Sequence, residues 1–269
     1  MLPNHLKGLN LRSSGLKTVE GHTINVWEFS PPTDPALLDC WALHFRRQYC
    51  TDKELPELLY GTGMTVEQYL NAYIFPDKTK APGPSIRSGD FAELLISDYL
   101  EFILNLWVPR EKYAEKASNN ESVKGVDIIG FHQLDAATST FGDALYAFEV
   151  KASLSGGTYG GQLQNAVDDG SSDQHIRLAV TLNATKRRFL REGKTLEVNR
   201  ISRFQNPTDN PYAYFSGAVA VLCNTAFNEE ELAKTLANAH SNADALYLMV
   251  VRSDLQMQLV HELYERACK

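Results

Sequence analysis

Four residues with side chains suited to metal-assisted hydrolysis follow one another along the chain: Glu93, Asp127, Glu149 and Lys151. Residues i and i+2 of a β-strand point to the same face, so Glu149 and Lys151 project together if residues 144–152 form a strand. An antiparallel pairing of this strand with residues 125–132 would bring Asp127 beside Glu149. The pattern therefore predicts two neighbouring carboxylates and one ammonium group at a hairpin.

This combination is suited to binding a divalent metal ion. Two carboxylates about 4 Å apart repel by roughly 4 kcal/mol at an effective dielectric near 20, so proteins keep such pairs where a proton or a cation offsets the repulsion. Mg²⁺ prefers one or two carboxylates with water and phosphate oxygens, and Asp127 and Glu149 supply the carboxylates. We expect Lys151 to position or activate water, or to stabilise charge on phosphate. Glu93 is expected to bind an outer-shell water or a second metal ion.

Each residue also has a purely structural interpretation. A Glu-x-Lys pair is common on solvent-facing strands, Asp127 alone could cap a turn, and Glu93 alone could lie on an exposed helix. The two strand acids, however, lie in the otherwise apolar runs GVDIIG and YAFEVKA. An unpaired buried charge is costly, so the combination favours a metal site.

The elements around these residues follow from the apolar pattern. Residues 89–107 have helical spacing, and residues 125–132 and 144–152 are strand-like. A helical region over about residues 162–191 follows, with an interruption near Gly170. The polar segment between the two strands is short enough for a hairpin connection.

Two further apolar runs are typical of buried strands, at residues 216–223 and 246–251. A helix from the Asn228 N-cap to about His240 follows the first, and a helix over residues 254–267 follows the second. The order predicts an α/β fold, with a mixed sheet flanked by helices and an antiparallel hairpin leading into parallel strands.

The N-terminal part has fewer elements. Residues 23–29 predict a strand, residues 35–49 predict a helix after the Asp34 N-cap, and Thr65 with Gln68 fits the capping box of a short helix. A small α+β region is therefore expected before the main sheet.

A proline- and lysine-rich stretch, residues 76–85, is the best candidate for a domain boundary. It divides the chain into an N-terminal region, residues 1–80, and a catalytic domain, residues 81–269. The hydrophobic content of 43% and charged content of 22% are those of an ordinary folded protein. The four cysteines form no CxxC pair, and no segment has the length of a membrane span, so we expect a cytoplasmic protein without membrane contact.

The net charge of −7 argues against nonspecific coating of nucleic acid, because a phosphate-neutralising surface is normally basic. Basic residues are nevertheless concentrated in one segment: Lys186, Arg187, Arg188, Arg191 and Lys194. This basic cluster has two interpretations, a phosphate contact and a solvated helix face. No motif for a small-molecule cofactor is found, since GGTYGGQ at residues 156–162 lacks the ending of a phosphate loop.

Taken together, these residues resemble the PD-(D/E)xK nuclease superfamily. Asp127 matches the acid of the second core strand, Glu149-Val150-Lys151 matches the (D/E)xK motif, and Glu93 matches the acid of the first helix. The resemblance implies an αβββαβ (restriction-endonuclease-like) core. It also implies Mg²⁺-dependent hydrolysis of phosphodiester bonds, with Mn²⁺ as a substitute.

The resemblance assigns roles to further residues. The carbonyl group of Val150 is implied as a metal ligand, and Gln162 or Gln164 is implied as a support of the site. Val126 stands where the motif usually has proline, a departure shared by many members.

A narrower resemblance is carried by the segments GDFAELL, VKGVDIIGFH and FEVKAS, which look like the HamA nuclease subunits of Hachiman anti-phage defence systems. It covers roughly residues 85–265. It implies a DNA target, a partner helicase (HamB) and a docking or regulatory role for residues 1–80.

Two alternatives remain open at this point. The chain could be a catalytically silent subunit with a nuclease fold that binds nucleic acid or a partner, because fold does not fix function. It could also act on RNA. Binding of Mg²⁺ or Mn²⁺ separates a silent subunit from an active one.

Overall fold

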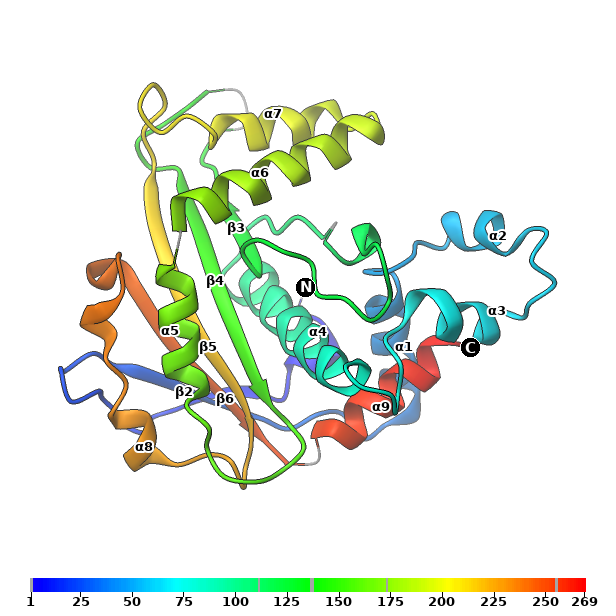
Figure 1. Ribbon diagram of the computed structural model, residues 1–269. Helices are drawn as coiled ribbons and strands as arrows, with labels where there is room; N and C mark the ends of the chain where they lie inside the picture. The colour runs from blue at the N-terminus through cyan, green and yellow to red at the C-terminus, as the bar shows by residue number, and fades with distance from the viewer. Residues whose placement is uncertain (1, 111, 136–137, 173, 255) are drawn as a thin grey trace.

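A computed structural model describes residues 2–110, 112–135, 138–172, 174–254 and 256–269 (Figure 1). These residues form one six-stranded sheet in the order β1-β2-β6-β5-β4-β3. The strands are Leu9–Arg12 (β1), Ile24–Phe29 (β2), Ile128–His132 (β3), Ala144–Ser153 (β4), Ala213–Cys223 (β5) and Leu246–Ser253 (β6). The predicted α/β class with a mixed sheet is confirmed.

Helices lie on both sides of this sheet (Figure 1). The α-helices are Pro35–Arg46 (α1), Glu54–Leu59 (α2), Val66–Tyr69 (α3), Gly83–Asp98 (α4), Gln162–Ser171 (α5), Gln174–Arg191 (α6), Thr195–Arg203 (α7), Glu229–Ala233 (α8) and Gln256–Ala267 (α9). Short 3-10 or π-helical turns are Asn4–Leu6 (η1), Leu70–Ile74 (η2), Tyr99–Ile103 (η3), Tyr113–Glu115 (η4), Ala237–Ala239 (η5) and Ala243–Ala245 (η6). Among the described helices, none is long and apolar enough to cross a membrane.

The strand pairing places a hairpin at each end of the sheet. β3 and β4 pair antiparallel, as the sequence predicted, and β1 and β2 form the other antiparallel pair. β4, β5, β6 and β2 run parallel to one another. β5 and β6 carry runs of buried residues, because helices cover both of their faces.

The alternation of β4 divides its side chains between two cores. Phe148 and Val150 belong to the core that α1, α4 and α9 form on one face of the sheet. Leu145 and Ala147 belong to the core under α6 and α7 on the other face. Glu149 lies between Phe148 and Val150 in sequence, so alternation directs its side chain to the second face.

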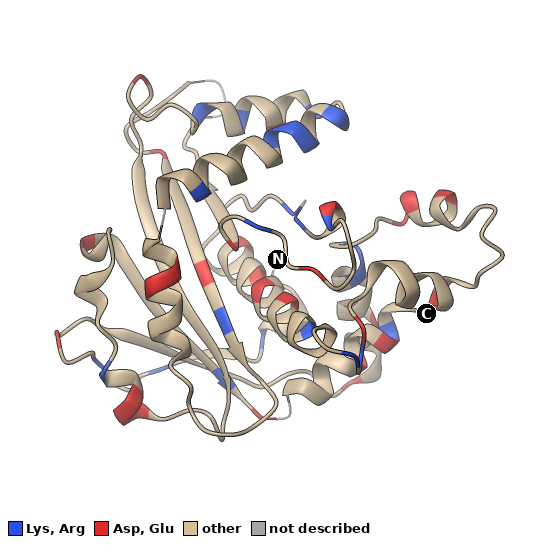
Figure 2. Ribbon diagram, viewed as in Figure 1, with Lys and Arg blue, Asp and Glu red and all other residues tan. Residues whose placement is uncertain are grey.

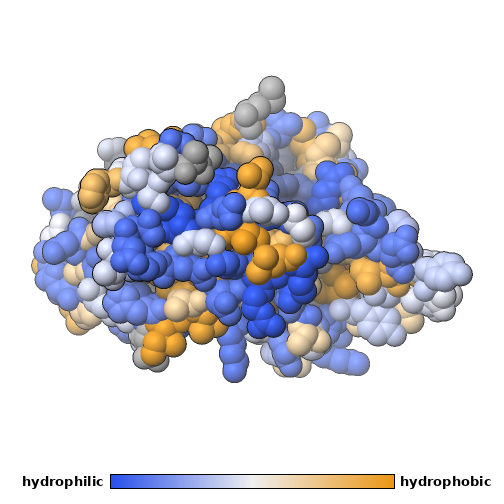
Figure 3. All heavy atoms as spheres, turned by 90° about the horizontal axis from the view of Figure 1, so that it is seen from above, coloured by the Kyte–Doolittle hydropathy of each residue, from blue (hydrophilic) through white to orange (hydrophobic). Residues whose placement is uncertain are grey.

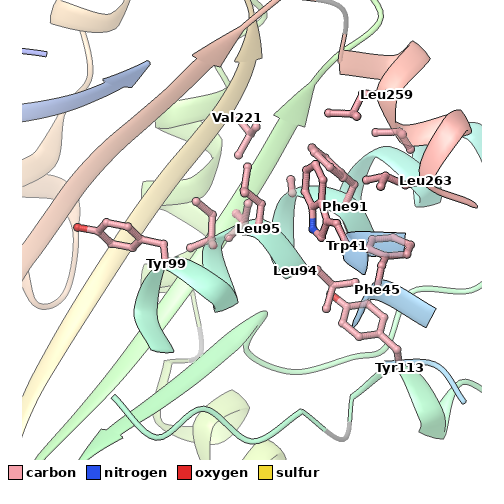
Figure 4. Packing of buried hydrophobic residues seen from close by; sticks show 14 of the residues in the cluster. Trp41, Phe45, Phe91, Leu94, Leu95, Tyr99, Tyr113, Val221, Leu259 and Leu263 are labelled. Carbon is pink, nitrogen blue, oxygen red and sulfur yellow. The ribbon is translucent and has the colours of Figure 1, made fainter. Parts of the chain in front are cut away.

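Helix α4 is the central helix of the first face (Figure 4). Leu95 of α4 lies toward Val221 of β5, while Phe91 contacts Trp41 of α1 with ring centroids 5.9 Å apart. Each fully buried side chain of this size contributes roughly 1.5–3 kcal/mol of transfer free energy. This packing fixes the helix that carries Glu93.

Several predicted boundaries are corrected by the structure. The helix expected from residue 89 begins at Gly83, where Pro84 occupies one of the first two helical positions that tolerate proline. The Asn228 cap is confirmed, since its side chain accepts a hydrogen bond from the Glu231 N–H. The helix that it starts ends at Ala233 rather than near His240, because the chain leaves helical dihedral angles at Leu236.

The N-terminal residues contribute to the same sheet. The predicted strand at residues 23–29 is confirmed as β2, which pairs in parallel with β6. The Asp34 cap and the Thr65–Gln68 capping box are also present. The division of roles between residues 1–80 and 81–269 stays a prediction.

The face formed by α6 and α7 is mainly hydrophilic when seen from above (Figure 3). The exposed apolar side chains of these two helices include Ile176, Leu190 and Leu196. Single exposed apolar side chains are normal on soluble proteins and indicate no binding surface by themselves.

Gly217 of β5 gives a stability prediction close to the site. It pairs with Phe148, and a Cβ atom there would lie 2.4 Å from that aromatic ring. We expect Gly217→Ala to lower the free energy of unfolding by about 1–3 kcal/mol, because the ring must shift within a packed core. Chemical denaturation measures the effect.

Gly89→Ala is the matched control. Its Cβ would meet no atom within 4 Å, and it lies inside helix α4. Alanine should stabilise the helix there by about 0.5–1 kcal/mol. Equal effects of the two substitutions would contradict the close packing at Gly217.

Candidate active site

Asp127 and Glu149 belong to the two neighbouring chain segments at the start of the β3–β4 hairpin. The register pairs Ile128 with Phe148, so one residue further along it Asp127 lies across from Glu149. Asp127 precedes the first residue of β3, and its Oδ2 accepts a hydrogen bond of 2.9 Å from the Val150 N–H. Asp127 is thereby tied to the middle residue of the Glu-x-Lys motif.

Glu93 reaches the same region from α4. Its Oε2 accepts hydrogen bonds from Lys112 Nζ at 2.6 Å and from Tyr113 Oη at 2.7 Å. Lys112 Nζ also contacts Asp127 Oδ1 at 3.4 Å and the Asp127 carbonyl oxygen at 3.2 Å. Burial raises the pKa of Glu93 to about 7, although the Lys112 ammonium opposes that shift.

Glu149 and Lys151 form an ion pair on the neighbouring strand. Lys151 Nζ lies 2.9 Å from Glu149 Oε1 and 2.7 Å from Asp169 Oδ2, and Arg177 lies 2.8 Å from Glu149 Oε2. Burial raises the pKa of the Glu149 carboxyl, and the charge of Asp127 adds to that shift. Burial lowers the pKa of Lys151, but the contacts with Asp169 and Glu149 outweigh it and raise the pKa overall. Lys151 is therefore held as an ammonium ion.

The predicted residues are divided between two cavities. Glu93, Asp127, Val150 and Lys151 line one cleft of about 530 Å³. Glu149 does not line this cleft; it is 4% exposed and lines a smaller cavity. Figure 2 shows the acidic and basic positions of β4 beside the acidic positions of α4.

Three contacts of this site escaped the sequence interpretation. Lys112 and Tyr113 come from a segment without periodicity, and Arg177 comes from the polar helix α6, outside the basic cluster at its end. The sequence indicated these partners only indirectly: each acid in an apolar environment needs a counter-charge, but the sequence did not identify which residue supplies it.

The glutamines suggested as supports of the site have other partners in the described part of the chain. Gln162 accepts a hydrogen bond from the Gly160 N–H. Gln164 donates to Asp168 and accepts from the Leu236 N–H. Their contacts connect loops at the start of α5 and do not reach Asp127 or Glu149.

The basic cluster on α6 is largely paired with glutamates. Arg188 contacts Glu54, Glu115 and Glu192, and Arg191 also contacts Glu115. Figure 2 shows basic positions along α6 and at the turn into α7. The pairing favours the structural interpretation of this cluster over a phosphate contact.

The donor atoms of the site are suited to a hard divalent cation. In the part of the chain that the structure describes, no three His, Cys, Asp or Glu side chains are arranged to hold a metal ion. The Lys112 ammonium is nevertheless surrounded by two carboxylate oxygens and a carbonyl oxygen, which are the ligand types that Mg²⁺ prefers. In this structure the Lys112 ammonium, and not a metal ion, lies beside these oxygen atoms.

Comparison with known proteins identifies the family. None of the curated proteins compared with the chain matches it. A family model described as HamA matches residues 7–267, which extends beyond the segments that carry the resemblance and includes the N-terminal strands. With nearly the whole chain matched, the protein belongs to the HamA family.

Proposed function

We propose that this chain is the nuclease effector of its Hachiman defence system and hydrolyses DNA phosphodiester bonds with Mg²⁺ or Mn²⁺. Membership of the HamA family implies a subunit of such a system. The observation that carries the nuclease proposal is the hydrogen bond from the Val150 N–H to Asp127 Oδ2. It fixes the strand acid against the Glu-x-Lys motif, at a cleft that Glu93 also lines.

The order of elements supports a PD-(D/E)xK core. After α4, Trp107 forms an isolated antiparallel bridge to Phe131, and β3, β4, α5 and β5 follow. This is the αβββαβ order if the bridge at Trp107 takes the place of the first of the three consecutive strands. The antiparallel hairpin beside parallel strands agrees with the same core.

Glu93, Asp127, Glu149 and the Val150 carbonyl group are the proposed metal ligands. A bound divalent ion would supply Lewis-acid polarisation of phosphate and a more acidic water. Lys151 remains protonated between its acidic neighbours, so its role is to stabilise negative charge on the phosphate rather than to remove a proton.

Neighbouring residues hold these groups in place. Arg177 contacts Glu149 Oε2 and donates to the Gly125 carbonyl oxygen at 2.7 Å, so it joins the buried acid to the chain that leads into Asp127. Asp169 of α5 holds Lys151 from the other side. Such fixed charges need little reorganisation during the reaction.

Incubation of the purified chain with plasmid DNA and Mg²⁺ tests the proposal. We expect nicking or degradation that requires Mg²⁺ or Mn²⁺ and stops with a chelator. The same assay with its partner helicase added tests whether the complex changes the rate. Cleavage that persists in excess chelator would exclude the proposed metal chemistry. Cleavage of RNA but not of DNA would show that the substrate is RNA.

One observation favours a second candidate, a catalytically silent subunit that binds nucleic acid or a partner. The three proposed acids are already neutralised by Lys112, Lys151 and Arg177. A silent site should take up neither Mg²⁺ nor Mn²⁺ in a calorimetric titration. Metal uptake together with DNA cleavage would eliminate this candidate.

A further inference from the structure

Lys112 lies at the centre of the acid cluster, although it is outside the predicted motif. Its Nζ contacts Glu93 Oε2, Asp127 Oδ1 and the Asp127 carbonyl oxygen at 2.6, 3.4 and 3.2 Å. The side chains of Lys112, Glu93 and Asp127 are 17%, 15% and 15% exposed. A single ammonium group thus lies between two partly desolvated carboxylates and offsets half of their formal charge.

The segment that carries Lys112 is anchored beside it. Tyr113 donates a hydrogen bond to Glu93 and is itself buried in the core of the first face. Lys116 contacts Asp90, one turn before Glu93 on α4, and both side chains of that pair are nearly fully buried. The backbone near Lys112 is therefore held, while its long side chain retains rotatable bonds.

A divalent ion and the Lys112 ammonium compete for the same oxygen atoms. Mg²⁺ binds oxygen at about 2.0–2.1 Å and tolerates little departure from octahedral geometry. A positively charged nitrogen in contact with the same oxygens would both block the ion and repel it. Both cations cannot bind Glu93 Oε2 and Asp127 Oδ1 together in the observed arrangement.

Charge balance indicates that one cation must leave when metal binds. The acidic side chains in contact here are Glu93, Asp127, Glu149 and Asp169, and the basic ones are Lys112, Lys151 and Arg177. Their formal charges sum to −1, so a divalent ion leaves one uncompensated positive charge, and the departure of one ammonium group restores neutrality. Lys151 is fixed by Glu149 and Asp169, and Arg177 contacts two backbone carbonyl groups as well as Glu149. Lys112 is the cation whose carboxylate partners are both proposed metal ligands.

We propose that Lys112 is a built-in cation that holds the metal position between Glu93 and Asp127, so that divalent metal loads only when this side chain moves away. The inference rests on the proposed metal-dependent function. In the metal-free protein the Lys112 ammonium then occupies the metal position, and the acids are stable without the ion. The cost of displacing Lys112 raises the metal concentration at which the site fills.

Isothermal titration with Mn²⁺ tests this competition without measuring activity. Lys112→Met keeps the length of the side chain and removes its charge, and we expect it to bind Mn²⁺ at least about tenfold more tightly than the unsubstituted protein. Its melting temperature should be lower without metal and should recover when Mn²⁺ is added. Both effects follow because Glu93 and Asp127 lose their counter-charge.

Lys116→Met is the matched control, because it removes the same charge from the same segment but its partner is Asp90. It should be less stable than the unsubstituted protein without any gain in Mn²⁺ affinity. Equal or weaker affinity in Lys112→Met would overturn the proposed competition. The nuclease proposal would still stand in that case if the unsubstituted protein cleaves DNA with Mg²⁺.

Amine labelling of the unsubstituted protein provides a test that needs no variant. Lys112 should react slowly with an amine-modifying reagent in the presence of a chelator and faster in Mn²⁺, as followed by mass spectrometry of its peptide. Lys116 should stay slow in both. Unchanged reactivity of Lys112 under conditions where calorimetry shows bound Mn²⁺ would overturn the inference.

Discussion

Replacing Glu149 by glutamine should reduce Mg²⁺-dependent DNA cleavage by at least about a hundredfold, the scale of losing one preorganised charged group at a reacting centre. The amide keeps the shape of the side chain but removes the negative charge that faces Lys151 and Arg177. Lys151→Met should cause a loss of similar size, because Lys151 lines the cleft and its ammonium group contacts Glu149. Initial rates of plasmid nicking measure both effects.

Asp168→Asn provides the control for these two variants. Asp168 lies on α5 next to Asp169, is exposed and contacts Gln164 rather than Lys151. Its activity should match that of the unsubstituted chain. Full activity in both Glu149→Gln and Lys151→Met would remove this site from the mechanism.

Asp98→Ala is expected to have the largest effect on stability. Asp98 is 2% exposed and contacts His5 at 2.8 Å, His44 at 3.0 Å and Arg110 at 2.8 Å. Removing the carboxylate leaves the two histidines without the acceptor that they share and leaves Arg110 with Glu101 as its remaining carboxylate partner, so we expect a loss of about 3–5 kcal/mol in the free energy of unfolding. Urea denaturation at neutral pH measures the change.

The same residue predicts how stability depends on pH. Burial raises the pKa of Asp98, but hydrogen bonds from His44 and His5 and the charge of Arg110 outweigh it, so the pKa falls well below its ordinary value of 3.8. A lowered carboxyl pKa contributes stability above the ordinary value, and this stability is lost as the pH falls from there through the folded-state pKa. Asp98→Asn should flatten the acid side of the stability profile.

Asp39→Ala is the comparison for Asp98. Asp39 pairs with Arg266, but its side chain is 57% exposed. Exposed ion pairs contribute about 0–1 kcal/mol, so this substitution should change stability little. Similar losses for the two aspartates would contradict the assignment of Asp98 as a buried anchor.

The hairpin that carries the candidate site was predictable because it depends on local pattern. Alternation within residues 144–152 fixed which side chains share a face, and the acid in the apolar run before β3 identified its partner strand. The register of β3 and β4 confirmed that pairing. Such information is contained within a few neighbouring residues.

The remaining contacts depend on long-range packing. Lys112 approaches Glu93 and Asp127 from a segment with no regular structure, and Arg177 lies 28 positions after Glu149. No periodicity relates such residues. The early end of α8 at Ala233 has a similar cause, because the Leu236 N–H bonds to Gln164 of α5 instead of continuing the helix.

The parallel pairing of β2 with β6 has a consequence for biosynthesis. Residues 24–28 bond to residues 248–252, so the ribosome must release most of the chain before the sheet can close. Until then β1 and β2 can form only an isolated two-stranded antiparallel pair, and such a pair is marginally stable in water. The proposed nuclease would thus acquire its complete sheet only after residues 246–253 have left the ribosomal tunnel.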